Sequence, residues 1–287
     1  MAEKKIHIIA DCLCDLPEEY LRENNVSTVY YYITTDTGRF LDREEISAQN
    51  IFEYFLEGGK TAQTYGPSPE EFLKIYEEKL NEYDEIIHLA ISSKMDPCYN
   101  NSKAAAEQLG ELGKRIHVFD TWHCTTGMGH VVMRAVDLLK AGNTSEEIIA
   151  DLTKFREKVS TTFLAYSARY LAQNERFPKI KQFVLALFNM HPVLVFKCGG
   201  IGLKGFSFGS YEKAIKRYVR SELKNITKIK KDRVFLTHAA CTVKDIEIAK
   251  RETAKYLSLE TVKVTKACAS IACNSGPRAV GLFFAME

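Results

Sequence analysis

The fold of this chain is decided by residues 86–120, where two strand-like runs flank a helical stretch. Residues 86–91 read IIHLAI and end at the pair Ser92-Ser93, and residues 116–119 read IHVF and end at Asp120. The stretch between these runs contains three consecutive alanines, which favour a helix. Two short apolar strands joined by a helix predict a βαβ unit and therefore a parallel sheet.

The same alternation continues on the N-terminal and C-terminal sides of this unit. Residues 6–10 and 26–33 predict strands, and Pro17 opens a helix between them. Residues 68–71 and 144–147 have the composition and spacing of capping boxes, so each predicts a further helix start. The first half of the chain is therefore predicted to be an α/β domain with a parallel sheet.

The pattern loosens after about residue 158, where the last of these helices is expected to end. Beyond it we predict a hairpin over 193–196 and 206–208, helices at 211–224 and from Thr242, and strands at 234–238, 261–265 and 282–285. We therefore predict two α/β domains, residues 1–158 with a parallel sheet and residues 159–287 with a mixed sheet. The ligand cleft is expected between them.

The composition is typical of a folded soluble protein and argues against several classes. Hydrophobic residues make up 46% of the 287 residues and charged residues 26%. A net charge of +2, from 39 basic and 37 acidic residues, argues against nucleic-acid binding. No apolar run has the length of a transmembrane helix, and the run after Lys5 is too short for a signal peptide. A cytoplasmic protein is expected.

Two kinds of short motif have both a chemical and a structural interpretation. Residues 200–205 spell G-x-G-x-x-G, but the FSF that follows alternates as a strand does, and no acidic residue ends it. We interpret this motif as a hairpin turn and not as a dinucleotide site. The eight cysteines include no C-x-x-C pair, so Cys12, Cys14 and Cys124 are expected to be reduced packing or loop residues, not catalytic thiols.

Isolated acidic and histidine residues are interpreted in the same way. Asp11 and Asp15 are four residues apart and could bind a metal, but Asp15 stands three residues before Glu18. That spacing is more simply explained if Asp15 is a helix N-cap. His191 and His238 are expected to be buried and hydrogen-bonded.

The serine pair at 92–93 leaves two interpretations open. Hydroxyl groups beside free backbone amides, where a strand gives way to a helix, form a site suited to a carboxylate or phosphate. Alternatively, one of the serines only caps the helix expected at Asn100.

Six short blocks spread along the chain resemble the motifs of the DegV family of fatty-acid-binding proteins. The blocks are DCLCDLP at 11–17, KTAQT at 60–64 with PEEF at 69–72, ISS at 91–93 with Tyr99, FDT at 119–121, YLAQNER at 170–176 and NSGP at 274–277. They follow the order of the family's D-S-x-x-D-L-P, K-T-S-Q-P-S, I-S-S-x-L-S-G-T-Y, D-S, Y-L-x-x-G-G-R and H-x-G-P-G motifs, over about residues 6–285. No single block is specific, but six in register are.

The resemblance implies a two-domain α/β carrier that holds one long-chain fatty acid, such as palmitate, between its domains. It implies that Thr61 and Ser93 hold the carboxylate, and that Ser92, Asn274 and Arg176 complete the binding site. It also implies a partner, a separate ATP-dependent fatty acid kinase that makes acyl-phosphate for phospholipid synthesis. The sequence has no P-loop or kinase signature, so the chain itself is expected not to be an enzyme, and no cofactor or metal is expected.

Three departures from the family motifs lie around the expected head group. Asp96 brings a carboxylate into the segment that replaces L-S-G-T, Asn274 replaces a histidine and cannot carry a charge, and Arg176 lacks the two preceding glycines. These departures motivate one alternative, a binding protein for a different acidic or polar lipid. A second alternative is an enzyme related to dihydroxyacetone kinases, which would need a substrate-binding histidine and a nucleotide site.

Overall fold

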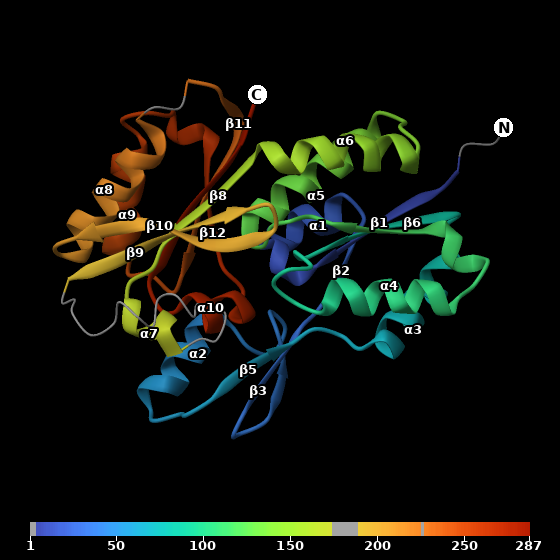
Figure 1. Cartoon of the computed structure of the whole chain (residues 1–287), viewed down its shortest axis with the longest axis horizontal. Helices are drawn as coiled ribbons and strands as arrows, with labels where there is room; N and C mark the ends of the chain where they lie inside the picture. The colour runs from blue at the N-terminus through green and yellow to red at the C-terminus, as the bar shows by residue number, and fades with distance from the viewer. Residues whose placement is uncertain (1–3, 174–188, 225–226) are drawn as a thin grey trace.

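The computed structural model describes residues 4–173, 189–224 and 227–287, which form two large sheets side by side and one small sheet (Figure 1). The first large sheet has the strand order β2-β1-β6-β7, and every neighbouring pair is parallel. Its strands are β1 (Ile6–Asp11), β2 (Val26–Val29), β6 (Glu85–Ala90) and β7 (Ile116–Asp120). The predicted parallel sheet of the first half is confirmed.

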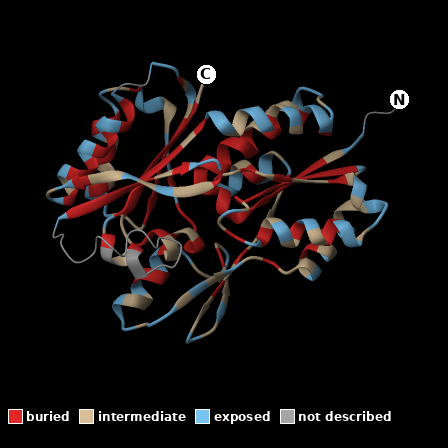
Figure 2. Ribbon diagram, viewed as in Figure 1, coloured by how far each residue is buried: buried red, intermediate tan, exposed pale blue. Residues whose placement is uncertain are grey.

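Burial on both faces explains why the central strands of this sheet read as nearly continuous apolar runs. Every residue of β6 and all but the first residue of β1 are buried (Figure 2). The helices that cover the two faces are α3 (Pro69–Leu80) and α4 (Cys98–Gln108) on one side, and α5 (Thr125–Lys140) and α6 (Ser145–Lys158) on the other (Figure 1).

The second large sheet is mixed, as predicted, with the strand order β10-β9-β8-β13-β11-β12. Only the pair β11–β12 is parallel. The strands are β8 (Val159–Leu164), β9 (Met190–Lys197), β10 (Gly200–Phe208), β11 (Ile229–Ala239), β12 (Val262–Lys266) and β13 (Ala279–Met286). Helices α8 (Tyr211–Leu223) and α9 (Val243–Thr253) pack together over this sheet.

Helix α5 lies between the two large sheets and is the element that they share. It contacts β1 of the first sheet and β8, β11 and β13 of the second. Two glycines allow this close packing, because a Cβ atom at Gly127 would lie 2.1 Å from Oγ1 of Thr161, and one at Gly129 would lie 2.8 Å from the carbonyl oxygen of Cys14. Gly127 thus faces the second sheet and Gly129 faces the loop after β1 in the first half, so side chains at these positions would force the two halves apart.

A small third sheet corrects the strand that the sequence predicts over 26–33. That segment is two strands, because β2 ends at Val29 and β3 (Tyr32–Thr35) pairs antiparallel with β4 (Arg39–Leu41) and β5 (Ala62–Tyr65). Val29 and Tyr31 are both buried, so the apolar pattern continues while the hydrogen bonds change from one sheet to the other. Helices α2 (Ala48–Leu56) and α10 (Ala269–Ser275) pack beside this sheet.

The local signals for helix starts and turns are mostly confirmed. Capping boxes occur at Ser68, Thr144 and Thr242, and residues 190–208 form the predicted hairpin. Its two-residue turn is Cys198-Gly199, both with positive φ, so the G-x-G-x-x-G motif lies in strand β10 and not in the turn.

The N-cap predicted at Asp15 is wrong, because α1 (Glu18–Glu23) has Pro17 at its N-cap and Asp15 binds elsewhere in the chain. The remaining short elements are the 3-10 helices η1 (Cys12–Cys14), η2 (Leu112–Arg115) and η4 (Leu259–Thr261), and helix α7 (Ala168–Gln173). In the described part of the chain, no helix is both long and apolar enough to cross a membrane.

Candidate functional site

A narrow apolar cavity lies between the two halves of the chain. The space open to the centre of a water molecule is about 60 Å³, and the empty space with its open mouth included is about 510 Å³. The first half contributes Met95, Cys124 and Thr125 to its wall, and the second half contributes residues of β8, β9, β10, β11, β13 and α10. Three phenylalanines of the second sheet line it: Phe163, Phe196 and Phe283. The lining is that of a site for an apolar ligand.

Helix α10 forms one side of the cavity, and two buried carboxylates of the first half hold its N-terminus. Asp42 accepts hydrogen bonds from the backbone N–H groups of Ala269 (2.9 Å) and Ser270 (2.8 Å). Asp15 accepts one from the N–H of Cys268 (2.8 Å). Three otherwise unpaired donors at the helix start are thereby satisfied, and the position of α10 depends on loops of the other half.

The ionised form of Asp15 is energetically unfavourable in this position. Burial raises its pKa from 3.8 to about 7, although the Arg43 guanidinium and the hydrogen bond from Cys268 act in the opposite direction. One carboxylate oxygen, Oδ2, is buried without a hydrogen-bond partner among the described residues. Asp15 is therefore partly protonated near neutral pH.

Of the predicted site residues, Asn274 lies in the cavity wall and Thr61 does not. The Asn274 amide donates to the carbonyl oxygen of Ser270 (2.8 Å) and to Oγ1 of Thr64 (3.4 Å). Thr61 is exposed, and its carbonyl oxygen accepts a hydrogen bond from Tyr54. Side chains alternate along β5, so Thr64 and Ala62 face inward while Gln63 and Tyr65, like Thr61 before them, face solvent. Sequence reasoning missed Thr64, which this period-two alternation could have identified.

The serine pair lies where the sequence predicts, but its hydroxyl groups bind other parts of the protein. Ser92 Oγ donates to the carbonyl oxygen of Gly199 (2.6 Å) in the hairpin turn. Ser93 Oγ donates to Asp120 (2.5 Å), whose carboxylate also accepts from the backbone N–H of Trp122 (3.0 Å). Neither serine caps α4, whose N-cap is Pro97. The strand-end polar groups are thus largely satisfied by one another.

Of two further residues that the family motifs single out, the structure describes Asp96 but not Arg176. Asp96 is buried and accepts hydrogen bonds from the backbone N–H of Cys98 (3.0 Å) and the hydroxyl of Tyr31 (3.4 Å), so these bonds fix its carboxylate at the start of α4. Arg176 lies outside the described residues.

Asp11 and His191, which the sequence also singled out, are hydrogen-bonded within the protein. Asp11 accepts from the N–H of Ile91 (2.8 Å) and contacts His88, and no group of three His, Cys, Asp or Glu side chains in the described ranges could hold a metal ion. His191 is buried, with its two ring nitrogens bonded to Tyr166 and Gly209.

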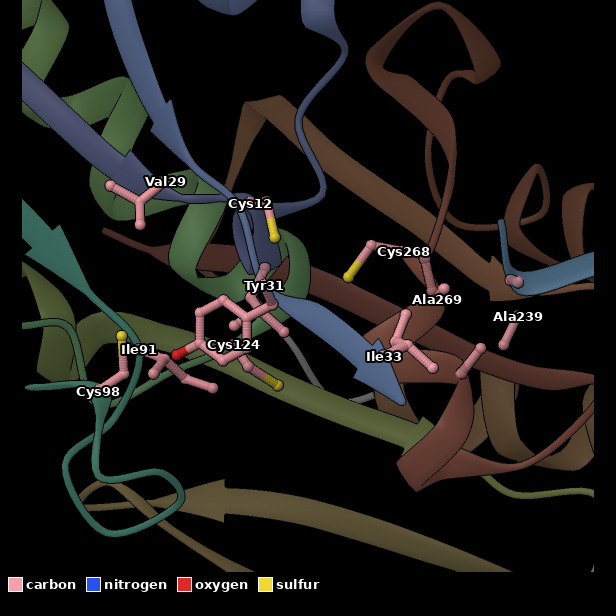
Figure 3. Packing of buried hydrophobic residues seen from close by; sticks show 14 of the residues in the cluster. Cys12, Val29, Tyr31, Ile33, Ile91, Cys98, Cys124, Ala239, Cys268 and Ala269 are labelled. Carbon is pink, nitrogen blue, oxygen red and sulfur yellow. The ribbon is translucent and has the colours of Figure 1, made fainter. Parts of the chain in front are cut away.

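All eight cysteines are free, and five of them are buried. Cys12 and Cys268, from opposite halves of the chain, turn their sulfur atoms toward each other in the core (Figure 3). Burial raises the pKa of both thiols, which argues against thiolate chemistry at this site.

Fold and site together define an α/β protein that encloses an apolar cavity between a parallel-sheet part and a mixed-sheet part. The chain belongs to the DegV family, whose model matches residues 5–287. A DegV domain-containing protein of Caldanaerobacter subterraneus is 26% identical over 284 residues, which cover 98% of this chain and 99% of that protein. The expected family is therefore confirmed.

Solved structures agree with this assignment over the whole chain. A fatty-acid-binding DegV family protein from Thermus thermophilus superposes with a TM-score of 0.86 at 27% identity, over 99% of this chain and all of that one. A DegV family protein from Eubacterium eligens, loaded with heptadecanoic acid, has a TM-score of 0.83 at 18% identity, over 98% of this chain and all of that one. DegV-family structures thus bind fatty acids with this fold.

Proposed function

We propose that this chain binds one long-chain fatty acid in the cavity between its two halves. The observation that carries the proposal is the apolar cavity itself, walled by both halves of a chain of the DegV family. Burying the roughly fifteen methylene groups of a C16 chain would contribute about 12 kcal/mol before the costs of association and ordering. The tail would therefore supply most of the affinity, and the polar residues would orient the head group.

For the head group, we propose the edge of the cavity where α10 meets β5. Asn274 and Thr64 lie together there, and Thr64 takes the place that the resemblance assigned to Thr61. We propose Ser93 as a weaker contact to the carboxylate. Its hydroxyl would have to break its hydrogen bond to Asp120 before it could donate to the ligand. Neutral hydrogen-bond donors suit a carboxylate that must later be presented to a partner protein. A buried ion pair would cost more free energy to form and to break.

Beyond fatty-acid binding, we propose that this chain is a carrier that presents the bound fatty acid to another protein. The fatty acid would be presented in the cytoplasm to a separate ATP-dependent kinase, which would convert its carboxylate to an acyl-phosphate. The chain alone should then show no ATP hydrolysis with fatty acid and Mg²⁺, and acyl-phosphate should form only when a kinase subunit is added. ATP turnover by the purified chain, abolished by a mutation in it, would contradict this role.

Denaturing mass spectrometry of the protein purified from cells tests the binding proposal directly. A C14 to C18 acid at one equivalent is expected, whereas a different acidic or polar lipid at one equivalent would replace fatty acid as the ligand. The matched variants are Ala239→Leu, which fills the cavity wall, and Ala254→Leu, on the exposed end of α9. Loss of bound acid in the first variant only would place the ligand in this cavity.

A further inference from the structure

One polar side chain of the cavity wall is not explained by the packing around it. His238, at the end of β11, lines the cavity and is only 8% exposed. Its Nδ1 atom accepts a hydrogen bond from the backbone N–H of Cys241 (3.4 Å). A backbone N–H can only donate, so Nδ1 carries a lone pair and the proton of the neutral ring is on Nε2.

The Nε2–H group has no acceptor among the described residues of the chain. Other polar side chains in the wall are bonded within the protein, since the hydroxyl of Thr237 bonds to Thr126 (2.6 Å) and to Thr265 (2.8 Å). Nε2 is not among the fully buried unpaired atoms of the described residues, and His238 lines the cavity, so an occupant that supplies an oxygen atom can accept its proton.

The surroundings of His238 favour a neutral ring that donates to an electron-rich atom. Burial lowers the pKa of His238, and the neighbouring Lys266 lowers it further. The N-terminus of α5 opens at the same cavity through Cys124 and Thr125, and the helix dipole makes that end partly positive. An oxygen with negative or partial negative charge is the group that both features would attract.

We propose that His238 contacts the bound lipid and donates its Nε2–H to an oxygen atom of that lipid. The inference rests on the proposed lipid-binding function and extends it to the chemistry of the ligand. The oxygen could belong to the carboxylate or to a hydroxyl or keto group along the chain, and the ligands of the test distinguish these two sources.

The first test uses the unmodified chain with ¹⁵N-labelled histidine, stripped of lipid. NMR of the His238 ring is recorded alone and with hexadecane, palmitic acid and palmitic acids hydroxylated at mid-chain or at the chain end. A downfield shift of the Nε2-bound proton with palmitic acid identifies the carboxylate as acceptor. A shift only with a hydroxylated acid identifies a chain oxygen. No shift with any oxygen-bearing ligand that binds overturns the proposal.

The second test compares substitutions of two buried histidines. His238→Phe should weaken binding of the ligand that shifts the ring by about tenfold, and His238→Gln, which keeps a donor, should restore part of that loss. His191→Phe is the control, because both ring nitrogens of His191 bond to the protein outside the cavity, so it should lower stability without lowering affinity. Equal affinities for all variants would overturn the proposal. Failure of the native chain to bind palmitic acid would instead contradict the proposed function.

Discussion

Two polar regions of this protein differ in how far the protein itself uses their hydrogen-bonding groups. At the ends of β6 and β7, Ser93, Asp120 and the backbone of Trp122 bond to one another. In the cavity wall, His238 has a donor that no described residue accepts, and α10 brings Asn274 next to Thr64. Polar residues at strand ends thus indicate a site only when the protein itself leaves their hydrogen-bonding capacity unused.

The largest effect is expected where the cavity wall depends on the other half of the chain. Asp42→Ala would leave the buried N–H groups of Ala269 and Ser270 without an acceptor, which should lower the free energy of unfolding by about 4 kcal/mol. Fatty-acid affinity should fall as well, because α10 loses its anchor. Urea unfolding and ligand titration measure both effects. Asp232→Ala, at an exposed position, is the control, and equal losses in the two variants would contradict the anchoring role.

The second prediction concerns the pH dependence of the same anchor. The pKa of Asp15 is about 7 in the folded chain against an ordinary 3.8, so the folded state holds this proton more tightly than the unfolded state does. Its contribution to stability is complete below about pH 4 and is lost as the pH rises to about 7. Asp15→Asn should remove this pH dependence. The expected effect on the free energy of unfolding is a few kcal/mol at most.

Asparagine can keep both the positive φ of Asp15 and the acceptor for Cys268. Urea unfolding of both proteins at pH 5 and pH 8 is therefore a fair comparison. An equal fall in stability for the two proteins between these pH values would show that Asp15 is not the titrating group.

A third prediction separates two threonines that are three residues apart. Thr64→Val removes the hydroxyl next to Asn274 and should weaken fatty-acid binding about tenfold, the effect of one hydrogen bond to a charged group. Thr61→Val changes an exposed hydroxyl and should alter affinity by less than about twofold. Both are isosteric changes, so calorimetric titration of the two variants compares position alone. The reverse order would restore Thr61 to the head-group site.

The smallest effect is expected at the strand-end region. Ser93→Ala should weaken binding only about two- to fourfold, because a hydroxyl that must give up Asp120 to reach the ligand gains little net energy. Titration of Ser93→Ala beside Thr64→Val measures the difference. A larger loss for Ser93→Ala than for Thr64→Val would mean that the strand-end region holds the carboxylate.

Local sequence signals determined the elements themselves. The capping boxes at Ser68, Thr144 and Thr242, the buried runs of β1 and β6, and the hairpin over 190–208 depend on neighbouring residues, so their sequence pattern is enough to predict them. Family membership could also be recognised from short blocks in register, and the match over residues 5–287 confirms it.

Only the tertiary structure decided which polar groups face the cavity. The break between β2 and β3, the anchoring of α10 by Asp15 and Asp42, and the pairing of Ser93 with Asp120 join residues that are distant in the chain or that change sheets. A serine, threonine or histidine has the same capacity to bond in every sequence context. Whether that capacity is used by the protein or left for a ligand depends on which distant backbone and side-chain groups the packing of the two halves brings within about 3 Å.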